Sequence, residues 1–341
     1  QIIDYKPDYL SGHYNLWAIS NDKFDKPIIR YAYLLAKLPG RLVRRVRKYK
    51  FDSFTANYLC ITKDRYSSCK EIEMNCPHAD MYIAGSDQIW NTIFPNGHDS
   101  SFYLNFVHNG ARRISYAASF ATDKIYNEAD EFVSKQLKNF DAISVRELGA
   151  LSLLNKLGIS TATLVVDPVF LLDSQEWQKL IRKKPKNKKY IFLYDCEKSK
   201  QLKLVAKALQ RATGLPIYNV SEFSGKYANR DYSLSGPLEF LQLLSDAEFV
   251  VANSFHALAF SLIFKKQFYI INRTEKINSR MADLLEYLGI KDRLIAEANI
   301  SNVATIDYNA VSLKLHNLVS SSKQYLLEQI RLASKLSDIK Y

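Results

Sequence analysis

The segment most informative about chemistry runs from Phe249 to Phe260. A buried strand is expected at 248–252, and an apolar helix begins shortly after it, at His256. Asn253 or Ser254 could cap this helix, so that its free N–H groups and the positive end of its dipole face a ligand. Phosphate and carboxylate groups bind at such helix starts. His256 adds a donor that can also act as a general acid. The alternative is a capped helix whose histidine only bonds a backbone carbonyl.

A second polar group follows another expected strand, at 81–84. Its glycine allows close backbone approach, and amide, hydroxyl and carboxylate side chains surround a tryptophan. Such side chains bind sugar hydroxyls, and a flat indole suits a sugar ring. The candidate sugar-binding residues are Gly85, Ser86, Asp87, Gln88, Trp90 and Asn91. The alternative is an Asx-turn in which Trp90 is a core residue.

Two arginines occupy comparable places. Arg146 follows an expected strand directly, and Arg280 opens an expected helix. A guanidinium group can hold a carboxylate or a phosphate with two parallel hydrogen bonds. The alternatives are surface pairs of Arg146 with Glu147 and of Arg280 with Asp283. Asp167, which is followed by proline, is interpreted as a turn residue rather than a ligand contact.

Short β-rich runs alternate with helical runs along the chain and must position these residues. Strands are expected near 2–5, 81–84, 113–118, 142–145, 163–166, 190–194, 216–220, 248–252 and 268–272. Helices are expected near 126–139, 148–157, 199–213, 237–245, 256–264, 280–288 and 311–337. Such alternation is typical of parallel sheets, whose ligands bind beyond the carboxyl ends of the strands.

The pattern restarts after a lysine-rich stretch at 179–189. We therefore expect an α/β fold with two Rossmann-like domains, at 1–175 and 176–320. A last helical segment, 321–341, has no strand after it and is expected to pack back on the N-terminal domain.

Composition limits the classes of function. Among 341 residues, 47 Lys and Arg face 35 Asp and Glu, a net charge of +12 with neutral histidines. Hydrophobic residues at 47% and charged residues at 24% disfavour disorder and a coiled coil. No apolar run reaches the ~18–20 residues of a membrane span, and the opening residues do not form a signal peptide. Because the chain does not begin with Met, residue 1 is expected not to be the natural start.

The four cysteines are too few for a disulfide scaffold and favour reduced thiols in the cytoplasm. Cys60, Cys69 and Cys76 lie near His78, but they lack the close Cys-x2-Cys pairing of structural zinc sites, so no metal site is expected. Gly-x-Gly-x-x-Gly, Walker, nucleophile-elbow and His-Glu-x-x-His motifs do not occur. This argues against the common dinucleotide, NTPase, hydrolase and zinc-protease functions.

Positive charge is concentrated in Arg41–Lys50, which holds six cations and no carboxylate. Such a run could contact an anionic membrane face or a lipid-linked substrate. Nucleic acid is not expected as a partner, because no nucleic-acid motif accompanies the run. The alternative is a solvated helix with Leu42, Val43 and Val46 as its buried stripe.

Taken in order, these segments resemble the polysaccharide pyruvyl transferase family. The motifs that carry the resemblance are 84–91 (Ala-Gly-Ser-Asp-Gln-Ile-Trp-Asn), 113–120, Ser144–Glu147, Val166–Pro168, Asn253–His256 and 278–293. They span roughly residues 80–315. The resemblance implies a pair of Rossmann domains arranged as in glycosyltransferases of the GT-B fold. Family members begin with a further strand, loop and helix ahead of residues 2–5, which this chain is expected to lack.

The resemblance also implies an activity. Members transfer the enolpyruvyl unit of phosphoenolpyruvate onto a sugar of a cell-surface polysaccharide or its lipid-linked precursor, as a ketal, and release phosphate. The family's histidine and strand-end arginine, both linked with phosphoenolpyruvate, map onto His256 and Arg146. The expected donor-binding residues are Arg146, Asn253, Ser254, Phe255, His256 and Arg280. The N-terminal domain is expected to take the acceptor, through the candidate sugar-binding residues at 85–91, and the C-terminal domain is expected to take phosphoenolpyruvate. Phosphoenolpyruvate is the donor substrate, and no cofactor is expected.

Two other functions stay open at this stage. A glycosyltransferase could use the same architecture and would bind a UDP- or GDP-sugar. A non-catalytic, membrane-associated protein of polysaccharide assembly would bind lipid through Arg41–Lys50 and would show no turnover with phosphoenolpyruvate.

Overall fold

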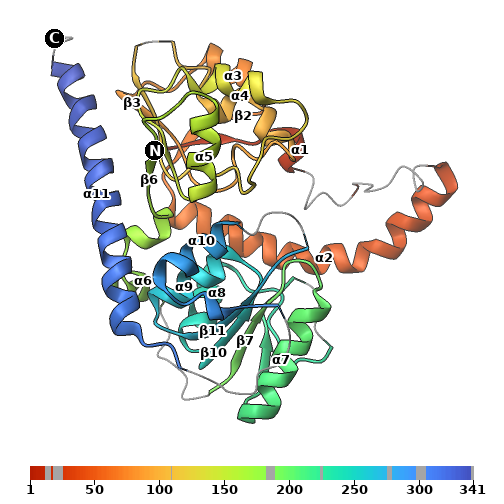
Figure 1. Cartoon of the computed structure of the whole chain (residues 1–341). Coiled ribbons are helices and arrows are strands. Elements are labelled where there is room, and N and C mark those ends of the chain that lie inside the picture. The colour runs from red at the N-terminus through yellow and green to blue at the C-terminus, as the bar shows by residue number, and fades with distance from the viewer. Residues whose placement is uncertain are drawn as a thin grey trace.

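The computed structural model describes residues 1–11, 17, 26–108, 110–181, 189–222, 226–274, 279–296 and 305–338. These residues form a mixed α/β fold in which all paired strands run parallel. Figure 1 shows the N-terminal strands above the larger C-terminal sheet. The expected α/β class with parallel sheets is confirmed, and the arrangement as two Rossmann-like domains stays a prediction.

The N-terminal part is built from three strand pairs. They are β1 (Ile2–Tyr5) with β2 (Ile61–Tyr66), β3 (Met81–Ala84) with β4 (Arg112–Ser115), and β5 (Ser144–Val145) with β6 (Thr163–Leu164). Single bridges from Ile114 to Ala142 and from Ala118 to Val145 connect the last two pairs. The strands β3, β4, β5 and β6 therefore follow one another in space, and their carboxyl ends lie at one edge.

Short helices cover these strands. They are α1 (Asp8–Ser11), α3 (Cys69–Met74), α4 (Asp130–Leu137) and α5 (Leu148–Lys156), with 3-10 turns at Pro95–His98, Ser100–Tyr103 and Pro168–Leu171. Helix α6 (Ser174–Leu180) leads toward the C-terminal part. Trp90 lies at the centre of the N-terminal core, where its ring packs against Tyr103, Phe120 and Phe140.

The C-terminal part holds a six-stranded sheet in the order β12-β11-β10-β7-β8-β9. The strands are β7 (Ile191–Tyr194), β8 (Ile217–Asn219), β9 (Arg230–Asp231), β10 (Phe249–Ala252), β11 (Gln267–Ile271) and β12 (Leu294–Ile295). This is the order of a doubly wound Rossmann sheet. The chain adds β8 and β9 on one side of β7 and then β10, β11 and β12 on its other side, so the strand order reverses between β7 and β10. Ligands of such sheets bind at that reversal, beyond the carboxyl ends of the strands.

The helices of this part bury both faces of the sheet. They are α7 (Lys200–Thr213), α8 (Pro237–Ser245), α9 (Phe255–Ile263) and α10 (Ser279–Leu288), followed by a 3-10 turn at Lys291–Arg293. The Ser199 side chain caps α7, and Gly214 ends it in the left-handed conformation, at φ 71°. Strand β10 and residues 268–271 of β11 are continuous apolar stretches, because helices cover both faces of the sheet there.

The long helix α11 (Tyr308–Asp338) lies along both parts of the molecule (Figure 1). Near its start, Val311 packs in the core of the C-terminal part. Farther along, the Ser322 hydroxyl accepts a hydrogen bond from the Val166 N–H at 2.9 Å. The Tyr325 hydroxyl donates to the Ser115 carbonyl at 3.2 Å, beside β4. The second half of α11 therefore packs on the N-terminal part.

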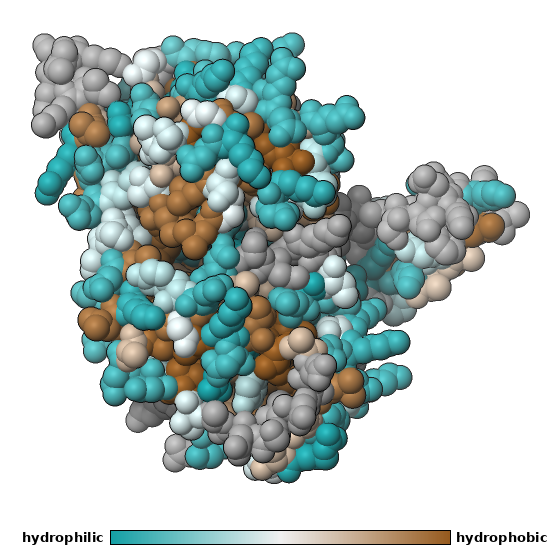
Figure 2. All heavy atoms as spheres, in the orientation of Figure 1, coloured by the Kyte–Doolittle hydropathy of each residue, from teal (hydrophilic) through white to brown (hydrophobic). Residues whose placement is uncertain are grey.

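Helix α2 (Pro27–Tyr58) contains the basic run Arg41–Lys50 and projects beyond the rest of the molecule (Figure 1). The expectation of a helix here is confirmed, but the expectation of a buried stripe is wrong. Leu42, Val43 and Val46 are all exposed. On the surface, hydrophilic and hydrophobic residues lie next to one another along the projecting end (Figure 2). No described helix is long and apolar enough to cross a membrane.

Most of the cations in this run pair with carboxylates of the same chain. Arg44 and Arg47 lie 3.6 and 3.4 Å from the carboxylate oxygens of Glu222, and Lys50 lies 2.6 Å from that of Glu239. Lys48 pairs with Asp52 one turn farther along the helix. The run therefore fastens α2 to the C-terminal part as well as carrying exposed charge.

Gly97 tests the packing of the loop that follows Trp90. A Cβ atom at this position would lie 2.4 Å from the Asn91 carbonyl oxygen, which belongs to fixed backbone. We expect Gly97→Ala to lower the free energy of unfolding by about 1–3 kcal/mol, the usual cost of overpacking. Gly149→Ala is the control, because a Cβ there has no neighbour within 4 Å. Urea unfolding measures both, and equal stability of the two variants would contradict this account.

Candidate active site

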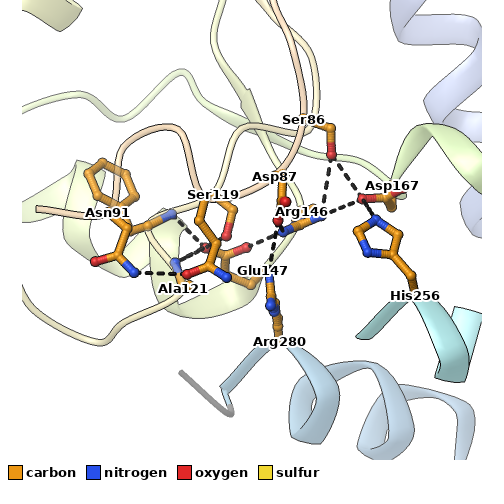
Figure 3. Close-up of polar contacts among 12 residues, drawn as sticks. Ser86, Asp87, Asn91, Ser119, Ala121, Arg146, Glu147, Asp167, His256 and Arg280 are labelled. Carbon is orange, nitrogen blue, oxygen red and sulfur yellow. Dashed lines mark hydrogen bonds and ion pairs between the residues drawn. The ribbon is translucent and has the colours of Figure 1, made fainter. Parts of the chain in front are cut away.

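A buried arginine organises the loops at the carboxyl ends of the N-terminal strands. The Arg146 side chain has no exposed surface. Its Nη2 donates to the Asp87 carboxylate at 2.6 Å, and its Nη1 donates to the Asp167 carboxylate and to the Ser86 hydroxyl at 3.3 Å. Ser86 in turn donates to Asp167 at 2.8 Å. Figure 3 shows these groups as one connected network.

Residues at the ends of five strands and helices form this site. Asp87 follows β3, Arg146 follows β5, and Asp167 follows β6 by three residues. From the C-terminal part, His256 lies in the first turn of α9, after β10, and Arg280 lies in the first turn of α10. The site therefore joins residues that are far apart in the sequence. Its C-terminal residues come from the sheet in which the strand order reverses between the neighbouring strands β7 and β10.

Asp87 connects the two arginines. Its carboxylate accepts hydrogen bonds from Arg146 and from Arg280 Nη1, the latter at 3.2 Å (Figure 3). The Asp87 side chain is itself 57% exposed, whereas both arginine side chains are buried. Its backbone has φ 73°, a left-handed conformation that costs a non-glycine residue free energy and is common at functional sites.

Phe255 packs against both guanidinium groups. The Arg146 Cζ lies 4.8 Å from the centre of the Phe255 ring, and the Arg280 Cζ lies 5.4 Å from it. Cations over an aromatic face are attracted by its quadrupole. Phe255 is buried, so it holds the two arginines near each other and is not itself open to a ligand.

His256 stands beside this network and is partly open to solvent. Its side chain is 44% exposed, and its Nε2 lies 4.0 Å from the Asp167 carboxylate. Burial lowers the pKa of His256 below the usual 6.5, and the two nearby arginines add to the effect, whereas Asp167 opposes it. The imidazole is therefore mainly neutral at pH 7 in the free protein.

The carboxylates of the site are also perturbed. Burial would raise the pKa of Asp87, but Arg146 and Arg280 outweigh it and lower the value to about 2. Glu147 differs, because its complete burial raises its pKa despite the adjacent Arg146. The Glu147 Oε1 accepts hydrogen bonds from the backbone of Phe120 and Ala121, at 2.9 and 3.1 Å. Glu147 therefore holds the loop after β4 in place through hydrogen bonds to its backbone.

Three buried side-chain atoms of the site lack a hydrogen bond among the described residues, namely the Nε atoms of Arg146 and Arg280 and the Oε2 of Glu147. The Arg146 Nε and the Glu147 Oε2 lie 3.9 Å apart, as an ion pair. Helix α9 begins after Ser254 without a side-chain cap, so its first N–H groups are not used by a capping side chain. These N–H groups and the two guanidinium groups can bind a small anion.

Four of the six residues predicted to bind the donor lie close to one another, and the donor-binding role of these four stays a prediction. Arg146, Phe255, His256 and Arg280 lie together. Asn253 is fully buried, and its side chain accepts from the Cys196 N–H at 2.8 Å and donates to Asp195 at 3.0 Å. Asn253 thus ties the loop after β10 to the loop after β7 and has no exposed surface for a ligand. Ser254, one of the two residues named as candidate caps, occupies the N-cap position of α9, but its side chain makes no capping hydrogen bond.

The predicted acceptor residues divide into two groups. Ser86 and Asp87 belong to the arginine network described above. Trp90 and Asn91 are fully buried, with 0% exposure, so the structure corrects the expectation that they contact a sugar. The Trp90 indole donates to the Phe102 carbonyl at 3.2 Å, and Asn91 donates to the Gln88 side chain at 2.9 Å. Gly85 and Gln88 lie in the same loop, and the acceptor role of both stays a prediction.

Sequence reasoning missed the contributions of Asp167 and Glu147. The Asp167 Oδ1 accepts from the Val169 N–H at 3.2 Å, so the expected turn is present. Its Oδ2 also binds Arg146 and Ser86, which the turn interpretation did not include. The signal that could have found it is its position directly after the strand expected at 163–166, at the same edge as Arg146. Among the described residues no cluster of His, Cys, Asp and Glu could hold a metal ion.

Comparisons with known proteins give the family and two structural likenesses. The family model described as Polysaccharide pyruvyl transferase matches residues 1–275. None of the curated proteins compared with the chain matches it significantly. A UDP complex of S. aureus MnaA resembles the fold with a TM-score of 0.44 and 14% identity, over 82% of this chain and 76% of that one. UDP-GlcNAc 2-epimerase from Neisseria meningitidis, bound to UDP-GlcNAc, has a TM-score of 0.39 and 11% identity, over 82% and 96%.

Asp167 tests whether the buried network supports the fold of this edge. We expect Asp167→Asn to lower the free energy of unfolding by about 3 kcal/mol or more, because it leaves the buried Arg146 with one counter-ion fewer. Asp52→Asn removes the exposed pair with Lys48 and should cost at most about 1 kcal/mol. Denaturant unfolding compares the two variants. A similar small cost for both would show that Arg146 does not depend on Asp167.

Proposed function

The chain belongs to the polysaccharide pyruvyl transferase family, and on that premise we propose that it moves the enolpyruvyl group of phosphoenolpyruvate onto a sugar of a cell-surface polysaccharide or its lipid-linked precursor. The product would be a pyruvate ketal, with release of phosphate. The observation that carries this proposal is a cluster of two arginines and a histidine around two carboxylates. Arg146 and Arg280 both bond the exposed Asp87 carboxylate, and His256 lies 4.0 Å from the Asp167 carboxylate, which Arg146 also bonds.

Phosphoenolpyruvate carries a carboxylate and a phosphate, and the site offers a donor set for both. The two guanidinium groups provide bidentate hydrogen bonds, and the uncapped start of α9 provides backbone N–H groups. The Asp87 carboxylate occupies part of this donor set in the free protein. It is the most exposed of the three acidic groups, so a substrate anion can take its place between the arginines.

His256 supplies the proton in the first step. The imidazole is mainly neutral in the free protein, and a bound dianion raises its pKa by favouring the charged form. The imidazolium then donates its proton to the methylene carbon of phosphoenolpyruvate. The carbon–carbon double bond supplies the electron pair, and C2 becomes an oxocarbenium-like centre. Asp167 lies 4.0 Å from His256 Nε2 and stabilises the charged imidazole.

Two sugar hydroxyl groups complete the reaction. The first oxygen attacks C2, and its proton returns to His256. The bond from C2 to the phosphate oxygen then breaks, and phosphate leaves with the bonding pair. The second hydroxyl oxygen attacks C2 and closes the ring, and its proton goes to the departing phosphate. Atoms and charge balance without a metal or a redox cofactor.

We place this reaction in the cytoplasm. The four cysteines are all unpaired, which suits a reducing compartment. A peripheral contact with the membrane through Arg41–Lys50 has weaker support, because four of its six cations pair with carboxylates of the chain. A lipid-linked acceptor remains part of the proposal and rests on the family alone.

Replacing His256 tests the general-acid role. We expect His256→Ala to lower the rate of transfer by about 10²-fold or more, the usual contribution of a general acid. The assay incubates the protein with phosphoenolpyruvate and candidate glycosides, and records phosphate release and the mass of one added pyruvyl unit. His316→Ala is the control, since this exposed histidine lies on α11, outside the site, where it bonds Ser320 at 3.4 Å. Near-normal turnover of His256→Ala would remove His256 from this role.

Replacing Asp87 tests its competition with the substrate anion. An exposed ion pair contributes up to about 1 kcal/mol. We therefore expect Asp87→Asn to lower the KM for phosphoenolpyruvate by about two- to fivefold. Asp173→Asn, at the exposed start of α6, is the control and should leave KM unchanged. A raised KM in Asp87→Asn would mean that Asp87 assists substrate binding instead of competing with it.

A further inference from the structure

Two neighbouring cavities lie along the junction of α2 and α8, and no residue of the arginine network lines either of them. The larger has a volume of about 550 Å³ and is lined by the sheet, by α8 and by residues that follow β9. The smaller has a volume of about 330 Å³ and is lined by α2 and the start of α8. Lys50, Leu238 and Glu239 line both. We name the two cavities together the α2–α8 groove.

Aromatic side chains from both parts of the molecule line this groove. Tyr190, Tyr218 and Tyr232 line the larger cavity. The Tyr190 and Tyr218 rings stack with centroids 4.1 Å apart, and the Tyr232 ring is tilted by 41° to that of Tyr218, with centroids 5.5 Å apart. Tyr232 is only half-buried, so part of its surface remains open. In the smaller cavity, Tyr49 of α2 is 73% exposed. Flat, rigid rings of this kind suit the apolar face of a sugar as well as other flat groups.

The charges of the groove distinguish its ligand from that of the arginine network. Two cations, Lys50 and Arg230, and three acids, Asp231, Glu239 and Asp246, line the larger cavity. Lys50 already bonds Glu239 at 2.6 Å, and the Arg230 guanidinium stacks on Tyr218. The lining thus offers no excess of positive charge for a phosphate or a nucleotide. Carboxylate, amide and hydroxyl groups beside aromatic rings match a neutral ligand rich in hydroxyl groups.

The smaller cavity lies at the same edge of the C-terminal sheet as His256. It includes Gly236 and Pro237, where α8 begins after β9, and His256 lies where α9 begins after β10. Between them, Tyr194 ends β7 and pairs in register with Ala252 of β10. Both helices start at the carboxyl edge, so a chain-like ligand can reach from one place to the other along that edge.

We propose that the α2–α8 groove binds sugar units of the acceptor chain beyond the sugar that receives the pyruvyl group. This inference rests on the proposed function, because it takes the acceptor to be a glycan. Sugar rings stack on Tyr49 and Tyr232, and their hydroxyl groups bond the acids and amides of the lining. The groove therefore favours long acceptors over short ones, whereas Arg146, Arg280 and His256 handle the donor.

Direct glycan binding without phosphoenolpyruvate tests this proposal. The full chain is applied to an array of one- to eight-unit oligosaccharides of glucose, galactose, mannose and N-acetylglucosamine, and the best binder is titrated by calorimetry. We expect longer chains to bind more tightly than the single sugar. Tyr49→Ala, an exposed position that should not affect folding, weakens long-chain binding by about fivefold or more. Leu238→Trp, which fills the shared wall of both cavities, has the same effect.

Tyr31→Ala is the matched control, because Tyr31 lies on the same helix, is 69% exposed and does not line the groove. It should bind like the unmodified chain. Length-independent binding, or long-chain binding that survives Tyr49→Ala and Leu238→Trp, would contradict glycan binding in the groove. Glycan binding with the expected pattern but without pyruvyl transfer would support the groove and contradict only the proposed function. Pyruvyl transfer to single sugars without length preference would support the proposed function and contradict the groove.

Discussion

Pairing of the buried Arg146 guanidinium is the interaction on which the site depends. A buried charge without a partner costs several kcal/mol, so three loops of the N-terminal part must bring acids to it. Asp87, Glu147 and Asp167 do so from the ends of β3, β5 and β6. Because Asp87 also bonds Arg280, the same pairing reaches the C-terminal part of the molecule. Stability of the fold and geometry of the site thus share one network.

This network is close to charge balance, although the whole chain carries a net charge of +12. Two arginines face the carboxyl groups of Asp87 and Asp167. The arginines lower the pKa of Asp87, whereas burial raises the pKa of Glu147. A substrate anion therefore gains little from a general positive field and must replace a specific internal partner. The exposed, backbone-strained Asp87 is the partner that can move with the smallest loss of buried contacts.

The sequence predicted well those elements that are defined by local patterns. Strands β7, β10 and β11 and helices α7 and α8 lie within a few residues of the expected positions, because apolar runs and capping residues mark them. It could not predict the pairing of Asp87 with Arg280 over 193 positions, since no local pattern encodes it. It also misplaced Trp90, because the same polar neighbours surround a core tryptophan and a sugar-binding one. The prediction of a buried stripe on α2 was wrong for a related reason. Periodicity shows that apolar residues share one face of a helix, but it does not show whether another element covers that face.

A crystal structure of the protein with phosphoenolpyruvate would show whether a substrate anion displaces Asp87 from the two arginines. We expect one anionic group of the substrate to lie between Arg146 and Arg280 in place of the Asp87 carboxylate. We also expect His256 to lie within hydrogen-bond distance of the substrate, beside the first N–H groups of α9. Substrate bound elsewhere, with Asp87 still bonded to both arginines, would contradict this displacement.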